Sequence, residues 1–162
     1  MKKHFQSQGR EKTNVAKKKA APKRSERVER GMKLLKRMGR EELMREQKET
    51  YPDLYNITVE HLFGDIWTRP HLSLRDRQLA TLAAGIALAR QTGNHSHYHS
   101  ALHIGITKEE IMELILHVGH YAGWPTIGLA MRQFNKVLKA AEANGKGGKR
   151  KSVDELSKEW ER

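Results

Sequence analysis

The segment from Leu79 to Ala89 most constrains the fold, because apolar side chains lie on nearly all sides of the helix that its spacing predicts. A helix that is apolar all round has no face for water and is typically buried among other helices. No segment of the domain alternates convincingly between apolar and polar residues, as a half-buried strand would. The sequence therefore predicts an all-α fold with one central helix that its neighbours cover.

Several segments combine helical spacing with helix-capping residues. Ser25 and Ser73 stand in front of apolar periodic runs, and Asn94 precedes a histidine-rich stretch. Thr107 is followed three residues later by a glutamate, which is the spacing of a capping box. Gly105 falls where a left-handed helix end is expected. We expect about six to seven helices, over residues 25–39, 41–48, 57–67, 73–89, 94–103, 107–121 and 125–145.

The formal charge of +12 is unevenly distributed along the 162 residues. Residues 1–24 hold nine Lys or Arg against one Glu, whereas residues 25–143 hold sixteen against fourteen acidic residues. The first segment also lacks periodic apolar residues, so it has little to bury against the entropy cost of folding. We expect a basic disordered tail over 1–24, one helical domain over 25–143, and a polar tail over 144–162 in which residues 152–160 can form a short helix.

The composition excludes several classes of function. The chain has no cysteine, so disulfides, zinc–thiolate sites and thiol redox chemistry are ruled out. No run approaches the roughly 18 apolar residues of a membrane span, and the N-terminus lacks the apolar stretch of a secretory signal. We therefore expect a cytoplasmic protein with no membrane partner.

The lysine-rich segment 1–24 raises a binding function as an alternative. Such arms bind nucleic acid and other acidic surfaces through counterion release. The basic residues here are not interleaved with aromatic ones for stacking on bases, and the segment has no known groove-reading motif. A solvated tail is therefore favoured over a nucleic-acid partner.

A series of short motifs resembles the gamma-carboxymuconolactone decarboxylase family over about Arg27 to Leu138. Each motif alone is weak, but their order and spacing together support the resemblance. They are Glu29-Arg30-Gly31, Phe63-Gly64-Asp65-Ile66-Trp67-Thr68-Arg69-Pro70, Arg75-Asp76-Arg77-Gln78-Leu79, His99-Ser100-Ala101-Leu102, Gly105-Ile106-Thr107, Glu110, Glu113-Leu114-Ile115-Leu116-His117 and Tyr121-Ala122-Gly123-Trp124-Pro125.

The resemblance implies an antiparallel helical bundle that assembles into a homo-oligomer, a trimer or a hexamer, with active sites near subunit contacts. It also implies a cofactor-free enzyme that removes CO2 from a small carboxylated lactone in the breakdown of aromatic acids, yielding the beta-ketoadipate enol-lactone. A related branch of the family reduces hydroperoxides through a Cys-x-x-Cys pair, which this chain lacks. We therefore expect a carboxy-lyase, with a different small-molecule reaction as the alternative.

The resemblance points to His99 and His117 as the groups that transfer protons. Glu113 lies one helical turn from His117 and could set its tautomer. The family's decarboxylases commonly carry a glutamate four residues before the histidine that matches His99, and this chain has His95 there. That difference puts an imidazole where a carboxylate would face the same pocket, so we expect His95 to contact substrate. The alternative for His99 is a core histidine that is hydrogen-bonded for structure.

The predicted substrate contacts include three further residues. Arg69 and Trp67 match the family's pocket wall, where a planar guanidinium can bind a carboxylate through two parallel hydrogen bonds. Tyr121 can donate from its hydroxyl. A core anchor is an equally good role for Trp67, and for Glu110 we expect a structural role.

Metal binding is a further alternative, because His95, His99 and His103 follow one another at four-residue steps. The first and last of these lie about 12 Å apart along a helix, so the three do not converge on one ion. A pair such as His95 and His99 would need a third ligand, for example His117. The family implies no metal, and we predict none.

Overall fold

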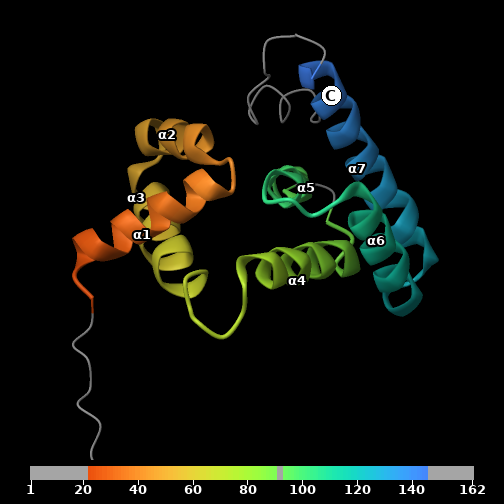
Figure 1. Ribbon diagram of the computed structural model, residues 1–162, viewed down its shortest axis with the longest axis horizontal. Helices are drawn as coiled ribbons and strands as arrows, with labels where there is room; N and C mark the ends of the chain where they lie inside the picture. The colour runs from red at the N-terminus through yellow and green to blue at the C-terminus, as the bar shows by residue number, and fades with distance from the viewer. Residues whose placement is uncertain (1–21, 91–92, 146–162) are drawn as a thin grey trace, which may run out of the picture.

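The computed structural model describes residues 22–90 and 93–145, and every regular element in these ranges is a helix (Figure 1). This confirms the predicted all-α fold. The observed bounds lie close to the predicted ones, and a short helix over residues 52–56, which was not predicted, precedes the helix predicted from residue 57. In chain order the elements are α1 (Arg24–Arg37), α2 (Glu41–Thr50), α3 (Pro52–Asn56), the π-helix η1 (Ile57–Ile66), α4 (Leu74–Ala87), α5 (Asn94–His103), α6 (Lys108–Ala122) and α7 (Trp124–Gly145).

Two glycines bring α1 and η1 into close contact. A Cβ atom on Gly31 would lie 2.1 Å from the carbonyl oxygen of Val59, and one on Gly64 would lie 2.4 Å from the carbonyl oxygen of Arg27. Any larger residue at either position would force the two backbones apart. The absence of side chains at these positions therefore sets the distance between the two helices.

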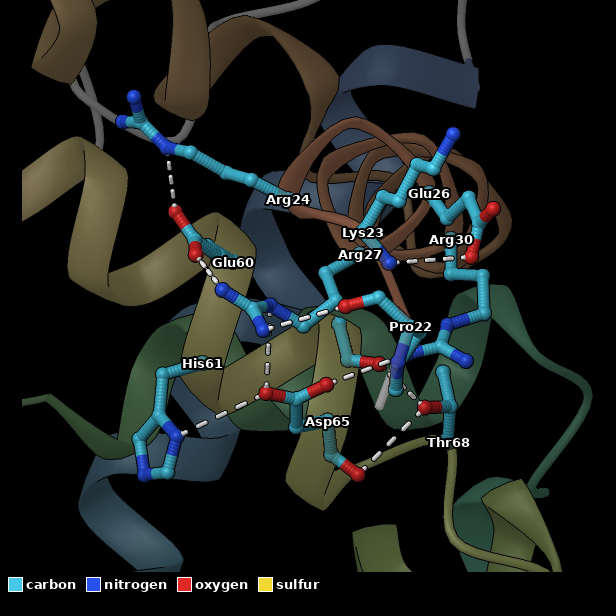
Figure 2. A network of polar contacts seen from close by, with 11 residues as sticks. Pro22, Lys23, Arg24, Glu26, Arg27, Arg30, Glu60, His61, Asp65 and Thr68 are labelled. Atoms are coloured by element: carbon cyan, nitrogen blue, oxygen red, sulfur yellow. Dashed lines mark hydrogen bonds and ion pairs between the residues drawn. The ribbon is translucent and has the colours of Figure 1, made fainter. Parts of the chain in front are cut away.

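Ion pairs add polar contacts to the same helix pair (Figure 2). The Nε atom of Arg24 donates to Glu60 at 2.8 Å, and Arg30 donates to Asp65 at 3.1 Å. Arg27 lies between these pairs and bonds to Glu60 as well. The hydrogen bonds from Arg27 and Arg24 hold the pKa of Glu60 below its ordinary value. Glycine contacts and charge pairs thus join α1 to η1 along one seam.

The hydrophobic side chains gather in two clusters that meet at one residue. The first, with Leu35 and Val59 fully buried, belongs to the helices from α1 to η1. The second, with Leu82 and Phe134 fully buried, belongs to α4–α7. Ile104 packs against both clusters and lies at the junction between the two halves of the chain.

Helix α4 is covered on one side only, so the prediction of a helix buried all round was wrong. Leu82 and Ile86 are buried, whereas Ala80 and Ala84 on the opposite side are exposed. Leu88 lies beyond the helix end and is 65% exposed. The apolar periodicity was correct, but no described element covers the alanine-bearing side.

The predicted caps of α4 and α6 are confirmed. Ser73 Oγ accepts a hydrogen bond from the backbone N–H of Asp76 at 3.1 Å. Thr107 Oγ accepts from the N–H of Glu110 at 3.2 Å, and the Glu110 carboxylate accepts from the N–H of Thr107 at 2.9 Å. Glu110 also pairs with Arg75, which supports its predicted structural role. Gly105 has a φ of +91°, as its position at a helix end predicts.

Two predicted caps were wrong. Helix α1 begins before Ser25, since Lys23 is the N-cap and its N–H donates to the carboxylate of Glu26 at 3.2 Å. Asn94 is the first residue of α5 rather than its cap, because Gly93 takes the cap position with a φ of +84°. These errors shift each helix start by one or two residues and leave the helices in place.

Residues 1–21 of the predicted tail and the predicted helix over residues 152–160 lie outside the described ranges. Lys23 and Arg24, which were assigned to the tail, belong to the start of α1. None of the helices described here is both long and apolar enough to cross a membrane.

Candidate functional site

Helix α5 carries its histidines on two flanks. His95 and His99 are four residues apart and share one flank, whereas His97 lies two residues from each and projects to the other. Tyr98 and Ala101 are fully buried and face the hydrophobic core between these flanks. The two sets of histidines therefore project in different directions from the helix.

Arg40, in the turn after α1, reaches the His97 flank of α5. Its Nε donates to Ser100 Oγ at 2.7 Å, and its Nη2 lies 3.0 Å from Nδ1 of His97. The guanidinium carbon lies 5.9 Å from the centre of the Phe63 ring. Burial lowers the pKa of Arg40 to about 10, so the side chain still carries its positive charge at pH 7. No acidic side chain in the described ranges pairs with it.

His97 has two further neighbours, Gln78 and Trp67. The amide nitrogen of Gln78 donates to the backbone carbonyl of His97 at 2.9 Å and lies 3.3 Å from its Nδ1. The Trp67 ring is roughly parallel to the imidazole, with 6.4 Å between ring centroids. Burial, followed by the positive charge of Arg40, lowers the pKa of His97 to about 3. The His97 imidazole is therefore neutral at pH 7.

A pocket of about 260 Å³ lies between the end of α4 and the start of α5, with His97 in its wall. Arg90 lines the same pocket and supplies a cation. A pocket of this size can hold a small organic anion beside a neutral imidazole. Its lining residues are Thr81, Ala84, Gly85, Leu88, Arg90, Gly93, Asn94 and His97.

The predicted residues His95 and His99 lie on the flank of α5 opposite His97. Burial is the largest cause that lowers the pKa of each; the positive charge of Arg40 lowers the pKa of His95 further, and His95 lowers that of His99. The Nε2 atom of His99 is buried and has no hydrogen-bond partner among the described residues. The two imidazoles are thus close to each other but apart from the pocket that His97 lines.

The predicted residues of α6 lie on its exposed side. His117 and Tyr121 have ring centroids 5.3 Å apart, and Tyr121 is 83% exposed. Glu113 lines a second pocket of about 390 Å³ between α6 and α7. His117 makes no hydrogen bond or ring contact with His99 in the described part of the chain.

The two predicted residues near the end of η1 differ in their surroundings. The Arg69 side chain is exposed, and its backbone carbonyl accepts a hydrogen bond from Arg77 at 2.7 Å. Trp67 is half-buried between Phe63 and His97. Of the predicted site residues, Trp67 stacks on His97 and His95 acts electrostatically on it, and the assigned roles of all of them remain predictions. No three His, Asp or Glu side chains in residues 22–90 and 93–145 come close enough to hold a metal ion.

Sequence reasoning missed His97 and Arg90, which line the pocket, and Arg40 and Gln78, which contact His97. The histidine-rich stretch contained His97, and helical spacing separates it from His95 and His99. Nothing in the sequence indicates which flank of α5 lies next to a cation, since Arg40 and His97 are 57 positions apart.

Comparison with known proteins identifies one family and two similar proteins for the helical part of the chain. The carboxymuconolactone decarboxylase family matches residues 52–136, from α3 into α7. The chain is 37% identical over 87 residues to a 4-carboxymuconolactone decarboxylase of Acinetobacter baylyi, covering 54% of this chain and 65% of that protein. It is 33% identical over 82 residues to a nitrosuccinic acid decarboxylase of Metarhizium robertsii, covering 51% of this chain and 57% of that protein. The matched segments span less than two thirds of either relative.

Proposed function

The chain belongs to the carboxymuconolactone decarboxylase family, and on that premise we propose that it is a cofactor-free carboxy-lyase for a small carboxylated acid. Both similar proteins are named as decarboxylases, which supports this class of reaction. Within the chain, the observation that carries the proposal is the neutral imidazole of His97, in the wall of a small pocket that Arg90 also lines.

In the proposed reaction the bond between carbon and the departing carboxylate breaks, and CO2 leaves. The electron pair moves onto the oxygen of a neighbouring electron-withdrawing group, so negative charge grows on that oxygen. A hydrogen-bond donor already aimed at this oxygen stabilises the transition state more than the substrate. A neutral imidazole can act as such a donor without being a charged acid. We assign this role to His97. The carbon then takes a proton from solvent.

Arg90 is the proposed anchor for a carboxylate that stays in the product. Tight pairing of a cation with the departing carboxylate would stabilise the substrate against loss of CO2 and would slow the reaction. Pairing with a second carboxylate orients the substrate without this cost. The favoured substrate therefore carries at least two acidic groups. Arg69, the anchor predicted from the resemblance, is the alternative.

Two substrates are proposed from the similar proteins. A 4-carboxymuconolactone-type lactone of aromatic-compound catabolism is the first candidate, with the lactone carbonyl as the electron sink. Nitrosuccinic acid is the second candidate, with the nitro group in that role. Both reactions need a hydrogen-bond donor at the oxygen of the electron-withdrawing group, so the His97 pocket is compatible with either substrate.

CO2 release by the purified full chain, incubated separately with each acid, tests the proposal. We expect turnover of one of them, and a loss in kcat/KM of about a hundredfold or more in His97→Asn. Asparagine keeps an acceptor where Nδ1 lies but lacks the donor at Nε2. His120→Asn on the exposed side of α6 is the matched control and should keep wild-type turnover. Failure of the folded wild-type chain to release CO2 from either acid would contradict the proposed activity.

We also propose that the chain forms a homo-oligomer, as the resemblance to trimeric and hexameric proteins implies. Large apolar side chains remain exposed in the single chain, including Ile57 at 61%, Leu88 at 65% and Trp124 at 66%. Exposed apolar surface of this kind is typical of subunit contacts. Size-exclusion chromatography with light scattering should give the mass of three or six chains, and a monomer at micromolar concentration would contradict this assembly.

A further inference from the structure

We propose that Arg40 is a positioning residue that holds His97 as an uncharged imidazole with its proton on Nε2. The value of this arrangement for turnover rests on the proposed function. The arrangement itself follows from the contacts around the imidazole and can be tested without any substrate.

The donor chemistry of arginine fixes the tautomer. A guanidinium has N–H donors and no acceptor, so the contact between Arg40 Nη2 and His97 Nδ1 at 3.0 Å needs a free electron pair on Nδ1. A neutral imidazole with an unprotonated Nδ1 carries its proton on Nε2. Arg40 therefore selects the tautomer whose N–H group is Nε2–H.

Gln78 presents a second donor to the same atom. Its amide nitrogen donates to the backbone carbonyl of His97 at 2.9 Å, and a side-chain carbonyl oxygen could not do so. This contact fixes the orientation of the amide group. The same nitrogen lies 3.3 Å from Nδ1 of His97, so both side chains that approach this atom are donors.

The surroundings of Arg40 hold its guanidinium group next to the His97 imidazole. The side chain is only 7% exposed, and Ser100 and the Phe63 ring hold it in place. Buried cations are ordinarily paired with an acidic group, and no acidic side chain in the described ranges pairs with this one. A neutral imidazole nitrogen therefore receives the hydrogen bond that a carboxylate would otherwise accept.

Protonation of His97 would place two cations in direct contact. The other charged or titratable groups that act on this imidazole are His95 on α5 and Arg90 at the end of α4, and both also disfavour its charged form. The remaining neighbours, Gln78 and Trp67, are uncharged. His97 thus stays neutral, and Nε2–H is the side-chain donor that it can offer to a ligand.

Arg40 lies before residues 52–136, the segment that the family comparison matches. Arg40 lies in the turn between α1 and α2. The turn between α1 and α2 would therefore contribute to the chemistry by placing a cation next to Nδ1 of His97.

Histidine nitrogen-15 NMR of the full chain, recorded from pH 8 to pH 3 without substrate, tests the proposal. In the wild type we expect His97 to stay neutral down to about pH 4, with an unprotonated Nδ1 and a proton on Nε2. Arg40→Met should raise the pH at which His97 titrates by one unit or more, because a like charge has been removed. Arg40→Lys keeps a cationic donor and should show a smaller rise. Arg45→Met, an exposed arginine of α2, is the matched control and should titrate as the wild type does.

A wild-type His97 that gains a proton near pH 6.5, or that carries its proton on Nδ1, would overturn the proposal even if Arg40→Met did not fold. A folded Arg40→Met chain in which His97 titrates as in the wild type would overturn it as well. Neither result depends on CO2 release, so a failure of the proposed decarboxylase activity would be recognised separately. If the wild type does turn over an acid, Arg40→Lys should retain more of kcat than Arg40→Met.

Discussion

The two flanks of helix α5 carry the same residue type in contrasting surroundings. On one flank, His97 has donors from Arg40 and Gln78 at Nδ1, and the Trp67 ring beside it. On the other flank, the Nε2 atom of His99 is buried and has no hydrogen-bond partner among the described residues. Burial is the largest cause of the lowered pKa on both flanks.

A histidine whose pKa is lowered by burial is not by itself a site. Both flanks have such a residue, but His97 also has partners that select its tautomer and a pocket that it lines. The family resemblance favours His99, whereas these contacts favour His97. The predictions below separate the two flanks, beginning with the largest expected effect.

His97→Asn and His99→Asn should differ most in turnover. Loss of the donor at His97 is expected to lower kcat/KM by about a hundredfold or more, whereas His99→Asn should lower it by less than about tenfold. Steady-state CO2 release from the acid that the wild type turns over measures both. A larger loss in His99→Asn would move the site to the other flank and restore the assignment made from the resemblance.

Gly85→Ala should test the close approach of α4 to the start of α5. A Cβ atom at Gly85 would lie 2.1 Å from Oδ1 of Asn94, which is 4% exposed and cannot easily move away. Overpacking of this kind is expected to lower the free energy of unfolding by about 1–3 kcal/mol.

Gly128→Ala in α7 is the matched control, because a Cβ atom there meets only the end of the Arg132 side chain at 3.6 Å. It should raise the free energy of unfolding by about 0.5–1 kcal/mol, as alanine does inside a helix. Urea unfolding of both variants measures the difference. Equal stability of the two would show that α4 and α5 are not held as closely as described.

Acidification should destabilise the fold chiefly through His97. The pKa of His97 is about 3 in the folded chain and ordinarily about 6.5, so the unfolded chain binds the proton more readily. Its contribution is complete above pH 6.5 and is lost progressively as the pH falls toward 3. Between pH 6.5 and pH 5 the loss from this residue amounts to about 2 kcal/mol.

The slope of the unfolding free energy against pH distinguishes the flanks. His97→Asn should flatten it most, because the variant has no titrating group at this position. His99→Asn should flatten it less, although its lowered pKa acts in the same direction. Chemical unfolding between pH 7.5 and pH 5 provides the measurement, and a slope unchanged in His97→Asn would contradict the neutral state assigned to this residue.

Ser100→Ala should have the smallest effect. Ser100 Oγ accepts from Nε of Arg40 at 2.7 Å, and its removal would leave a buried donor without a partner, at a cost of about 1–2 kcal/mol. Ser96→Ala is the matched control, because its hydroxyl bonds to the carbonyl of Gly93 at the helix start and is exposed. That change should alter the unfolding free energy by less than about 0.5 kcal/mol. Equal effects would contradict the buried contact of Arg40.

The parts of the fold that depend on neighbouring residues could be predicted from the sequence. The capping box of Thr107 and Glu110 and the left-handed Gly105 follow from interactions within a few positions. The cap of α5 was assigned to Asn94 because asparagine is a preferred N-cap residue, whereas in the structure Gly93 takes that position.

The residues of the site were harder to predict, because they come from distant parts of the chain. Gln78 and His97 are 19 positions apart, and Arg40 and His97 are 57 positions apart. Helical spacing shows that His97 differs from His95 and His99 in direction, but it gives no information on what each flank meets. The turn at Gly39, with a φ of +69°, helps to bring Arg40 to α5, and no motif in the sequence predicted this contact.

The most direct test of the central claim is a crystal structure of His97→Asn with the acid that the wild type decarboxylates. We predict that the acid occupies the pocket between α4 and α5, with one carboxylate on Arg90 and its electron-withdrawing group beside residue 97. An acid bound on the flank of His95 and His99, or against α6 beside His117, would contradict the account.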